Sequence, residues 1–126
     1  MHTDGVATCQ ALLAAIRERD GEAIGACLDP DVLLRVLTPH ALREEPGREA
    51  VVARYAAWLS LEELELLAAD AERVADRVRV RYRFRGRDPV KGWQENEHTA
   101  YATLENGLIV ALNVSCAGFR PVEPPS

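Results

Sequence analysis

The chain has few of the residues that mark metal-binding, redox or secreted proteins. Its 126 residues include three cysteines, Cys9, Cys27 and Cys116, an odd number without a C-x-x-C spacing. This pattern argues against a disulfide framework or a zinc site and favours a reducing cytoplasm. The sequence also lacks a Gly-rich phosphate loop, a cluster of metal ligands and a recognisable Ser/His/Asp set, so it predicts neither a cofactor nor a metal.

Long apolar runs and an excess of positive charge are missing as well. The run from Ala11 to Ile16 is short and ends in R-E-R-D, which fits neither a signal peptide nor a membrane span. The net charge is −5, whereas nucleic-acid-binding domains are usually basic. We therefore expect a cytoplasmic protein that binds neither membrane nor nucleic acid. Length and composition predict one domain, residues 1–120, followed by a tail, 121–126.

The clearest positive signal lies between Arg77 and Arg85. Every odd position in this stretch is arginine, and every even position is apolar: Val78, Val80, Tyr82 and Phe84. Side chains of a strand point alternately to opposite faces of a sheet. The stretch is therefore predicted to be a strand with one buried face and one charged face.

Helical spacing of apolar residues predicts three helices before this strand. They are a first helix through Ile16 that Asp4 can cap, a second over 21–28 that Asp20 can cap, and a third over 48–59.

Strand patterns and turn residues divide the remaining sequence. Residues 32–37 are predicted to be a short strand, 38–47 a loop, and 61–69 an ambiguous segment whose second half is assigned to a strand. Two more strands, 93–104 and 108–118, follow the arginine strand.

The two hairpin turns between these strands set which residues face the core. Pairing residue 86 with residue 92 places Arg83 opposite Glu95 and Val80 opposite His98. For the turn at 105–107, a two-residue Asn-Gly turn would bring Asn113 and Ser115 to the face shared with His98. A three-residue turn would bring Val110, Leu112, Val114 and Cys116 there instead. We expect the second, because it buries apolar residues.

Four motifs carry a resemblance to a known superfamily: R-E-R-D-G-E-A-I, L-D-P-D-V, P-G-R-E-A-V-V-A-R-Y and N-G-L-I-V-A-L-N-V. In this order they resemble the nuclear transport factor 2-like superfamily, in its SnoaL-like branch with polyketide cyclases and ketosteroid isomerase. The resemblance implies an α+β fold. In it, a cone-shaped, curved antiparallel sheet packs on three N-terminal helices around a central pocket, usually as a homodimer. It implies no particular reaction, because one fold hosts many chemistries.

The residues of ketosteroid isomerase that perform its reaction do not carry over. The positions that match its base, its second acid and its first-helix tyrosine are Val36, Ala100 and Leu12, all apolar. Tyr55 matches a position that is also tyrosine there and supports the acid network. The resemblance therefore implies that Tyr55 is a pocket hydroxyl.

His98 is the main candidate for a catalytic residue. Its predicted register points it inward, where a desolvated imidazole stays neutral near pH 7 and can act as a base. The alternative is a core histidine that is hydrogen-bonded to Tyr82 or Asn96. Tyr82 and Tyr55 could donate to a developing oxyanion, or could be ordinary core tyrosines. The residues expected to contact a substrate are Asn96, Trp58, Val36, Ala100, Val114, Cys116 and, from the loop at the mouth, His40.

Two functions remain open at this point. The first is a cofactor-independent cyclase, isomerase or hydrolase of secondary metabolism that acts on a hydrophobic small molecule. The second is a non-catalytic small-molecule-binding or dimerisation module. The absence of an inward carboxylate favours the second, and the inward histidine favours the first, which we prefer. We also expect a homodimer through the arginine face, which includes Trp93 and Tyr101.

Overall fold

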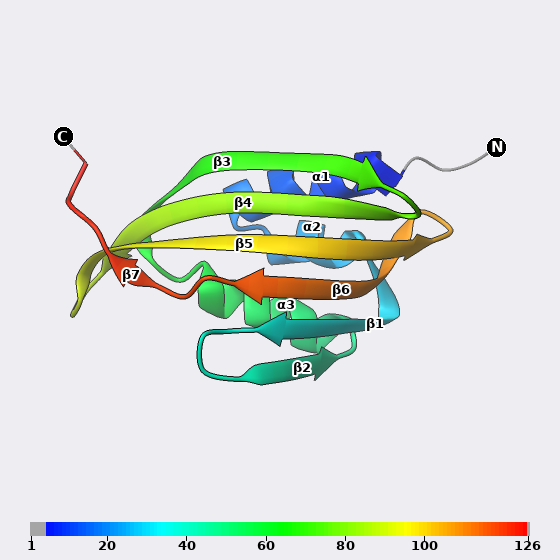
Figure 1. Ribbon diagram of the computed structural model, residues 1–126, viewed down its shortest axis with the longest axis horizontal. Helices are drawn as coiled ribbons and strands as arrows, with labels where there is room; N and C mark the ends of the chain where they lie inside the picture. Colours follow the sequence, from blue (N-terminus) through cyan, green and yellow to red (C-terminus); the bar gives the residue numbers. More distant parts are fainter. Residues whose placement is uncertain (1–4, 126) are drawn as a thin grey trace.

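The computed structural model describes residues 5–125, which form three helices and seven strands (Figure 1). The helices are α1 (Gly5–Glu18), α2 (Gly21–Ala26) and α3 (Arg48–Trp58). The strands are β1 (Leu28–Leu37), β2 (Leu42–Pro46), β3 (Glu62–Val74), β4 (Arg77–Asp88), β5 (Gly92–Glu105), β6 (Leu108–Cys116) and β7 (Arg120–Pro121). The three predicted helices are confirmed. Asp20 caps α2 by accepting from the Ala23 N–H, while Asp4 lies outside the described residues.

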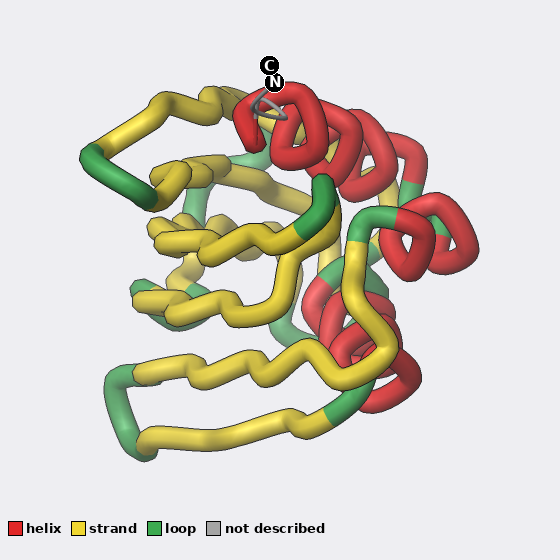
Figure 2. The backbone as a smooth tube through the Cα atoms, turned by 90° about the vertical axis from the view of Figure 1, so that its right-hand side faces the viewer, coloured by secondary structure: helices red, strands yellow, loops and turns green. Residues whose placement is uncertain are grey.

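The strands form one curved sheet that does not close, in the order β2-β1-β6-β5-β4-β3, with β7 added beside β5. Figure 2 shows the helices packed along one face of this sheet. The fold is α+β, as predicted. The expected antiparallel sheet is in fact mixed, because β1 and β6 run parallel. Local alternation reports only which face a residue takes, so it could not reveal the direction of a distant partner strand.

The predicted loop at residues 38–47 contains a strand, β2, which pairs with β1. Its sequence L-R-E-E-P is mostly polar and exposed, because β2 is an edge strand. Proline is tolerated at such an edge, where its missing N–H disrupts no further pairing. The helix or strand ambiguity at 61–69 is settled as strand, and β3 is longer than expected, reaching Val74.

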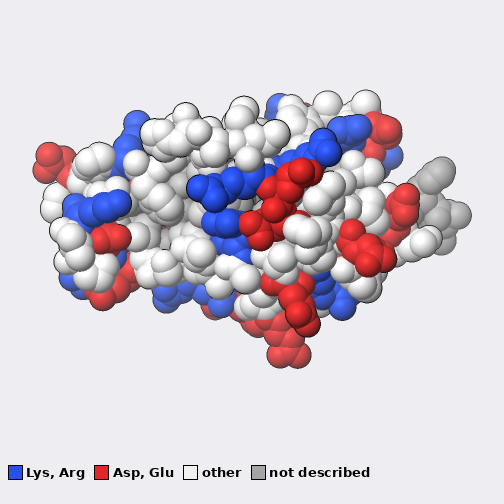
Figure 3. Space-filling model, turned by 90° about the horizontal axis from the view of Figure 1, so that it is seen from below, with Lys and Arg blue, Asp and Glu red and all other residues white. Residues whose placement is uncertain are grey.

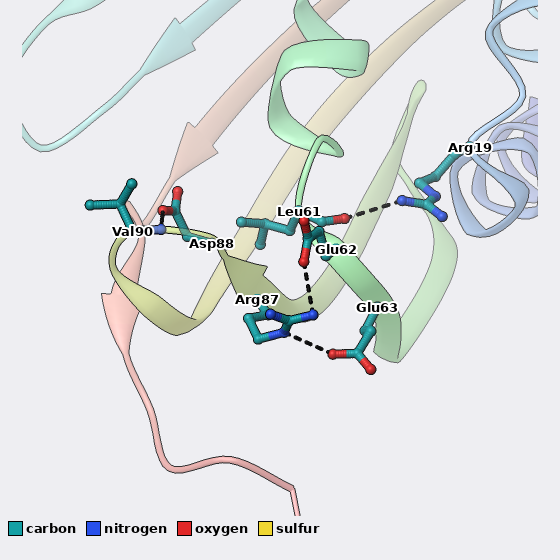
Figure 4. Close-up of polar contacts among 7 residues, drawn as sticks. All are labelled: Arg19, Leu61, Glu62, Glu63, Arg87, Asp88 and Val90. Atoms are coloured by element: carbon teal, nitrogen blue, oxygen red, sulfur yellow. Dashed lines mark hydrogen bonds and ion pairs between the residues drawn. The ribbon is translucent and has the colours of Figure 1, made fainter.

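The connection from α3 into β3 is held by cationic side chains (Figure 4). Arg19 donates to the Leu61 carbonyl at 3.1 Å, and Arg87 pairs with Glu62 at 2.8 Å and Glu63 at 3.0 Å. The backbone of β4 approaches this connection closely. A Cβ atom on Gly86 would lie 2.6 Å from the Leu61 Cβ, so the position requires glycine.

The arginine strand is β4, and its predicted faces are confirmed. Val78, Val80, Tyr82 and Phe84 are buried, while the arginines lie on the outer face. The predicted register is wrong by two residues, because Gly86 pairs with Gln94 and Tyr82 pairs with His98. The actual turn is shorter, at 89–91, where Asp88 accepts from the N–H groups of Val90 and Lys91. A shift of two residues keeps every side chain on its face.

The β5–β6 turn has two residues, not the expected three. Asn106 and Gly107 both have positive φ, 53° and 79°, as a type I′ turn requires. Leu112, Val114 and Cys116 nevertheless face inward as predicted, because a register shift next to Val110 changes the alternation. Val110 was expected inside, but Ile109 takes that place and is fully buried.

The core lies between the concave face of the sheet and the helices. It joins α1 residues such as Leu12 and Ile16 with sheet residues such as Leu34 and Leu112 in one cluster. No helix within residues 5–125 is long and apolar enough to cross a membrane. Figure 3 looks at the molecule from the side of the β2 edge and shows acidic groups lying directly beside basic ones. On that side the positive charge is neutralised locally.

Candidate functional site

The inner face of β5 carries three buried polar side chains, Gln94, Asn96 and His98. They occupy alternate positions and therefore point to the same face. His98 is fully buried, and it pairs across the sheet with Tyr82 on β4 and Cys116 on β6. No acidic or basic residue joins these three among the buried residues of the described chain.

The hydrogen bond of His98 is to Tyr82. The Tyr82 hydroxyl lies 2.6 Å from the His98 Nδ1. Tyr55 of α3 lies near enough to Tyr82 for each tyrosine to influence the pKa of the other. The other ring nitrogen, Nε2, is buried and has no hydrogen-bond partner. A buried polar atom without a partner is rare in folded proteins and calls for an explanation.

Burial changes the pKa values of His98, Tyr82 and Tyr55. It lowers the pKa of His98 to about 4, because the apolar surroundings disfavour the charged imidazolium. Burial also raises the pKa of Tyr82 well above its usual value and raises the pKa of Tyr55, because both phenolates would be desolvated. At pH 7 all three groups are therefore neutral.

Aromatic rings surround the His98 imidazole. Its ring centroid lies 4.5 Å from that of Trp58, 5.1 Å from that of Tyr82 and 5.6 Å from that of Phe84. All three contacts are edge-to-face. Trp58 comes from the end of α3, and Phe84 comes from β4, so His98 is clamped between helix and sheet. The predicted inward orientation of His98 is confirmed, while its aromatic neighbours were not foreseen.

The predicted site residues other than His40 are all buried, but only some of them contact His98. Asn96 bonds Cys116 rather than His98, with the Asn96 Nδ2 at 3.5 Å from the sulfur. Tyr55, Trp58 and Tyr82 lie in the buried group around His98. Val36, Ala100 and Val114 are buried core residues. Their role, like that of the other site candidates, stays a prediction.

His40 lies apart, exposed in the β1–β2 connection. The Thr38 hydroxyl accepts from the His40 N–H and organises this turn. The neighbouring Pro39 packs close to Gly118, where a Cβ would lie 2.9 Å from the Pro39 Cγ. The connection therefore touches the segment that leads to β7, but His40 itself is directed neither to an ion-pair partner nor into the core.

Gln94 was missed by sequence reasoning. It is 5% exposed and donates to the carbonyls of Trp93 and Lys91 at 3.2 and 3.5 Å. The signal was present, because the alternation that points His98 and Asn96 inward also includes residue 94. The error in the β4–β5 turn had placed residue 94 at the edge of the predicted strand.

Two hollows lie at the end of the sheet where β7 is found. One, of about 320 Å³, is lined by Asn96, Gly118 and charged residues including Arg83 and Arg120. The other, of about 110 Å³, is lined by Gln94, Phe119 and residues from the α3–β3 connection. Neither is lined by His98. The central pocket expected around His98 therefore stays a prediction.

The described residues contain no cluster of side chains suited to bind a metal ion. Within residues 5–125, no three His, Cys, Asp or Glu side chains are placed to hold an ion together. Cys9, Cys27 and Cys116 are all buried free thiols. Burial raises the pKa of Cys9 to about 12, so this thiol stays protonated and is a poor nucleophile at neutral pH.

A family model described as a SnoaL-like domain matches residues 9–112. The chain belongs to the SnoaL-like family. This confirms the resemblance that the motifs carried and places the protein in the nuclear transport factor 2-like superfamily. No curated protein matches the sequence.

Solved structures share the fold of this SnoaL-like protein at low sequence identity. An NTF2-like protein from Burkholderia xenovorans is 16% identical, with a TM-score of 0.69 over 89% of this chain and 88% of the other. A steroid delta-isomerase from Pseudomonas aeruginosa is 21% identical, with a TM-score of 0.63 over 96% and 82%. A hypothetical protein with a ketosteroid isomerase-like fold from Catenulispora acidiphila, in complex with trimethylamine, is 16% identical, with a TM-score of 0.67 over 85% and 82%. At these identities the similarity establishes the fold alone.

Proposed function

We propose that this SnoaL-like protein is a cofactor-independent enzyme that isomerises, cyclises or hydrolyses an apolar small molecule, with His98 exchanging a proton with the substrate. The observation that carries the proposal is the buried His98 Nε2, which no other group of the described chain satisfies. Family membership supports a small-molecule function, and a fold neighbour is named a steroid delta-isomerase.

The surroundings of His98 fit this role chemically. Aromatic and aliphatic side chains supply apolar contacts, and Tyr82 fixes the imidazole from its other nitrogen. A pKa of about 4 keeps the free imidazole neutral at pH 7. Negative charge that develops on a bound substrate would raise that pKa toward neutrality, where imidazole is best matched to general acid–base catalysis.

The test is turnover by a His98→Ala variant compared with Thr99→Ala. Thr99 follows His98 on the same strand and points to the opposite face, so it controls for damage to β5. A panel of apolar unsaturated ketones and epoxides would be followed by absorbance and mass spectrometry. We expect His98→Ala to fold and to lose roughly 10²–10⁴-fold in turnover, the usual contribution of general acid–base catalysis.

The contrary results are distinct. A folded His98→Ala variant with nearly full turnover would reject His98 as the catalytic group. A variant that does not fold, with Thr99→Ala intact, would assign His98 to the core instead.

A second candidate function is non-catalytic binding by the same interior. It is favoured by one observation, the absence of any buried carboxylate among the described residues. Compounds of the panel would then raise the melting temperature of the wild type without being consumed. His98→Ala would reduce that rise while turnover stayed absent in both proteins.

A further inference from the structure

The strand β3 forms one edge of the sheet, because β4 is its single neighbour. An edge strand can pair with a strand of another chain, so most proteins protect it by shortness, proline, charge or bulges. The opposite edge, β2, is five residues long and ends in Pro46. In β3 the register shifts twice before Ala68. The next segment, Ala68–Val74, pairs with β4 at seven consecutive positions and contains no proline. We call this segment the β3 edge.

The backbone of the β3 edge bonds to β4 alone among residues 5–125. In an antiparallel pair every second residue directs its N–H and C=O away from the partner strand. Along the β3 edge these groups therefore point out of the sheet. An extended segment of another chain can satisfy them by adding a strand, a common mode of peptide recognition.

A groove lies beside the β3 edge, where α1 packs along β3 (Figures 1 and 2). Ala69 and Ala71 of β3 point to the inner face of the sheet, because they pair with the inward-facing Tyr82 and Val80. An added strand would direct every second side chain to this same inner face, and the small alanines leave room for it. The groove has a volume of about 410 Å³ and is lined by Gln10, Leu13, Ala14, Arg17, Ala69, Asp70 and Ala71.

The two faces of an added strand would meet different charges. Asp70 and Glu72 are exposed on the outer face, where Arg81 and Arg79 of β4 contact them from one side. A basic side chain on the added strand would contact these carboxylates from the other side, as a cross-strand pair. On the inner face the groove includes the positive charge of Arg17, which disfavours a basic side chain there. The site therefore favours basic residues outside and apolar residues inside.

The same edge of a second copy is a poor partner. Antiparallel pairing centred on Ala71 would place Asp70 of one copy directly opposite Glu72 of the other. Pairing centred on Asp70 would place this acid opposite itself. Like charges directly opposite each other destabilise a strand pair. The charges of the β3 edge therefore favour a different, basic segment.

We propose that the β3 edge binds an extended segment of another protein in which basic residues alternate with apolar ones. The backbone of that segment bonds to β3, its apolar side chains enter the groove beside α1, and its basic side chains contact Asp70 and Glu72. The pattern is the one that β4 has on the other side of β3, R-V-R-V-R from Arg77 to Arg81. His98 does not line this groove, so the inference goes beyond the proposed function and does not depend on it.

Binding is tested by fluorescence anisotropy with the full-length protein and a labelled peptide, R-V-R-V-R-V-R. We expect this peptide to bind, and R-R-R-R-V-V-V, which has the same charge without alternation, to bind about tenfold more weakly or less. Two further peptides carry N-methyl groups on all valines or on all arginines, which blocks the N–H groups of one strand edge. One of the two should lose about tenfold or more in affinity, because an added strand uses one edge.

Three results would overturn the proposal: no binding of R-V-R-V-R-V-R by the wild type, equal binding of the peptide without alternation, or equal binding of both N-methylated peptides. The first would reject the site. The second would reduce the effect to attraction between net charges. The third would exclude the addition of a strand.

Variants of the protein locate the binding site. Ala14→Trp fills the groove and should weaken binding of R-V-R-V-R-V-R by about tenfold or more, because the valines lose their buried surface. Ala11→Trp is the matched control, since Ala11 is exposed on the same helix and does not line the groove. The double variant Asp70→Lys, Glu72→Lys should prefer E-V-E-V-E-V-E instead. Circular dichroism checks that each variant is folded. Unchanged binding by a folded Ala14→Trp would refute the placement of the peptide beside α1.

Discussion

At the residue scale, His98 lowers the stability of the fold, because it buries an imidazole whose Nε2 has no hydrogen-bond partner. The titratable side chains around it are Tyr82 on β4, Cys116 on β6 and Tyr55 on α3, and the described chain buries no acid beside it. A charged imidazole here would be desolvated and without an acidic partner, so the folded protein favours the neutral form. The folded-state pKa, about 4, lies below the value of 6.5 for an unperturbed histidine.

This difference predicts a loss of stability in acid. Between pH 6.5 and 4 the unfolded chain binds a proton at His98, whereas the folded chain does not. The free energy of unfolding therefore decreases as the pH is lowered through this range. The contribution of neutral His98 to the free energy of unfolding is fully present above pH 6.5 and is lost by pH 4. The total loss is about 3 kcal/mol. Urea unfolding from pH 7.5 to 4.5 would measure it.

His98→Gln removes this titration, and its stability should fall less steeply with pH than that of the wild type. The exposed His40 supplies the control, because His40→Gln should give a profile parallel to the wild type. Parallel profiles for all three proteins would contradict the burial of a neutral His98.

At the scale of elements, the segment from Ala117 to Val122 extends the sheet beside β5, next to the polar end of the core. It pairs with β5 at two positions. The Ala117 N–H donates to the Glu97 carbonyl, the Val122 N–H donates to the Trp93 carbonyl, and Arg120 pairs with Glu95. Phe119 is 44% exposed, and its ring meets Phe84 edge-to-face at 5.8 Å. Phe84 in turn contacts His98. Because its pairing with β5 is short and Phe119 is partly exposed, we expect this segment to open locally.

Phe119→Ala should therefore make this end of the core more accessible. An aromatic pair contributes about 0.5–1.5 kcal/mol, so opening should increase by about 2- to 10-fold. Alkylation of Cys116, which lies directly before the segment, would be followed by peptide mass spectrometry. Cys9 on α1 is the internal control in the same molecule, and its alkylation should not change. Equal acceleration at both cysteines would mean global destabilisation and would refute a local opening.

At the scale of the whole molecule, the outer face of the sheet is electrically balanced. Arginines of β4 pair with acids of the neighbouring strands: Arg79 with Glu72, Arg81 with Asp70, Arg83 with Glu95, Arg85 with Glu65, and Arg87 with Glu62 and Glu63. Such exposed pairs contribute at most about 1 kcal/mol each to stability. These pairs reduce the charge that would be buried if this face were covered, and Tyr101 lies on the same face, 38% exposed.

The homodimer predicted from the sequence would use this face. Light scattering should give twice the monomer mass of 13.9 kDa, falling on dilution. Tyr101→Lys should weaken the dimer by about tenfold or more, because aromatic residues are frequent binding hot spots. Val90→Lys, the same kind of change at a 92% exposed loop position, should have no effect. A wild type that remains a monomer at all concentrations would remove the prediction.

The sequence alone determined the faces of β4 and β5 and the family. Alternation of arginine with apolar residues fixed which side of β4 is buried, because the side-chain period of two follows from backbone geometry. The same rule pointed His98 inward, and the motifs indicated the SnoaL-like fold. Each of these inferences needed only local spacing.

The tertiary structure decided what depends on distant partners. It set the register of β4 against β5, since a shift by two residues leaves the local pattern unchanged. It paired β1 with β6 in parallel and placed a strand at Leu42–Pro46, whose sequence alone is that of a loop. Finally, it brought Tyr55 of α3 to Tyr82 and left the His98 Nε2 without a partner. Hydrogen bonding between residues far apart in sequence follows from packing, which spacing along the chain does not encode.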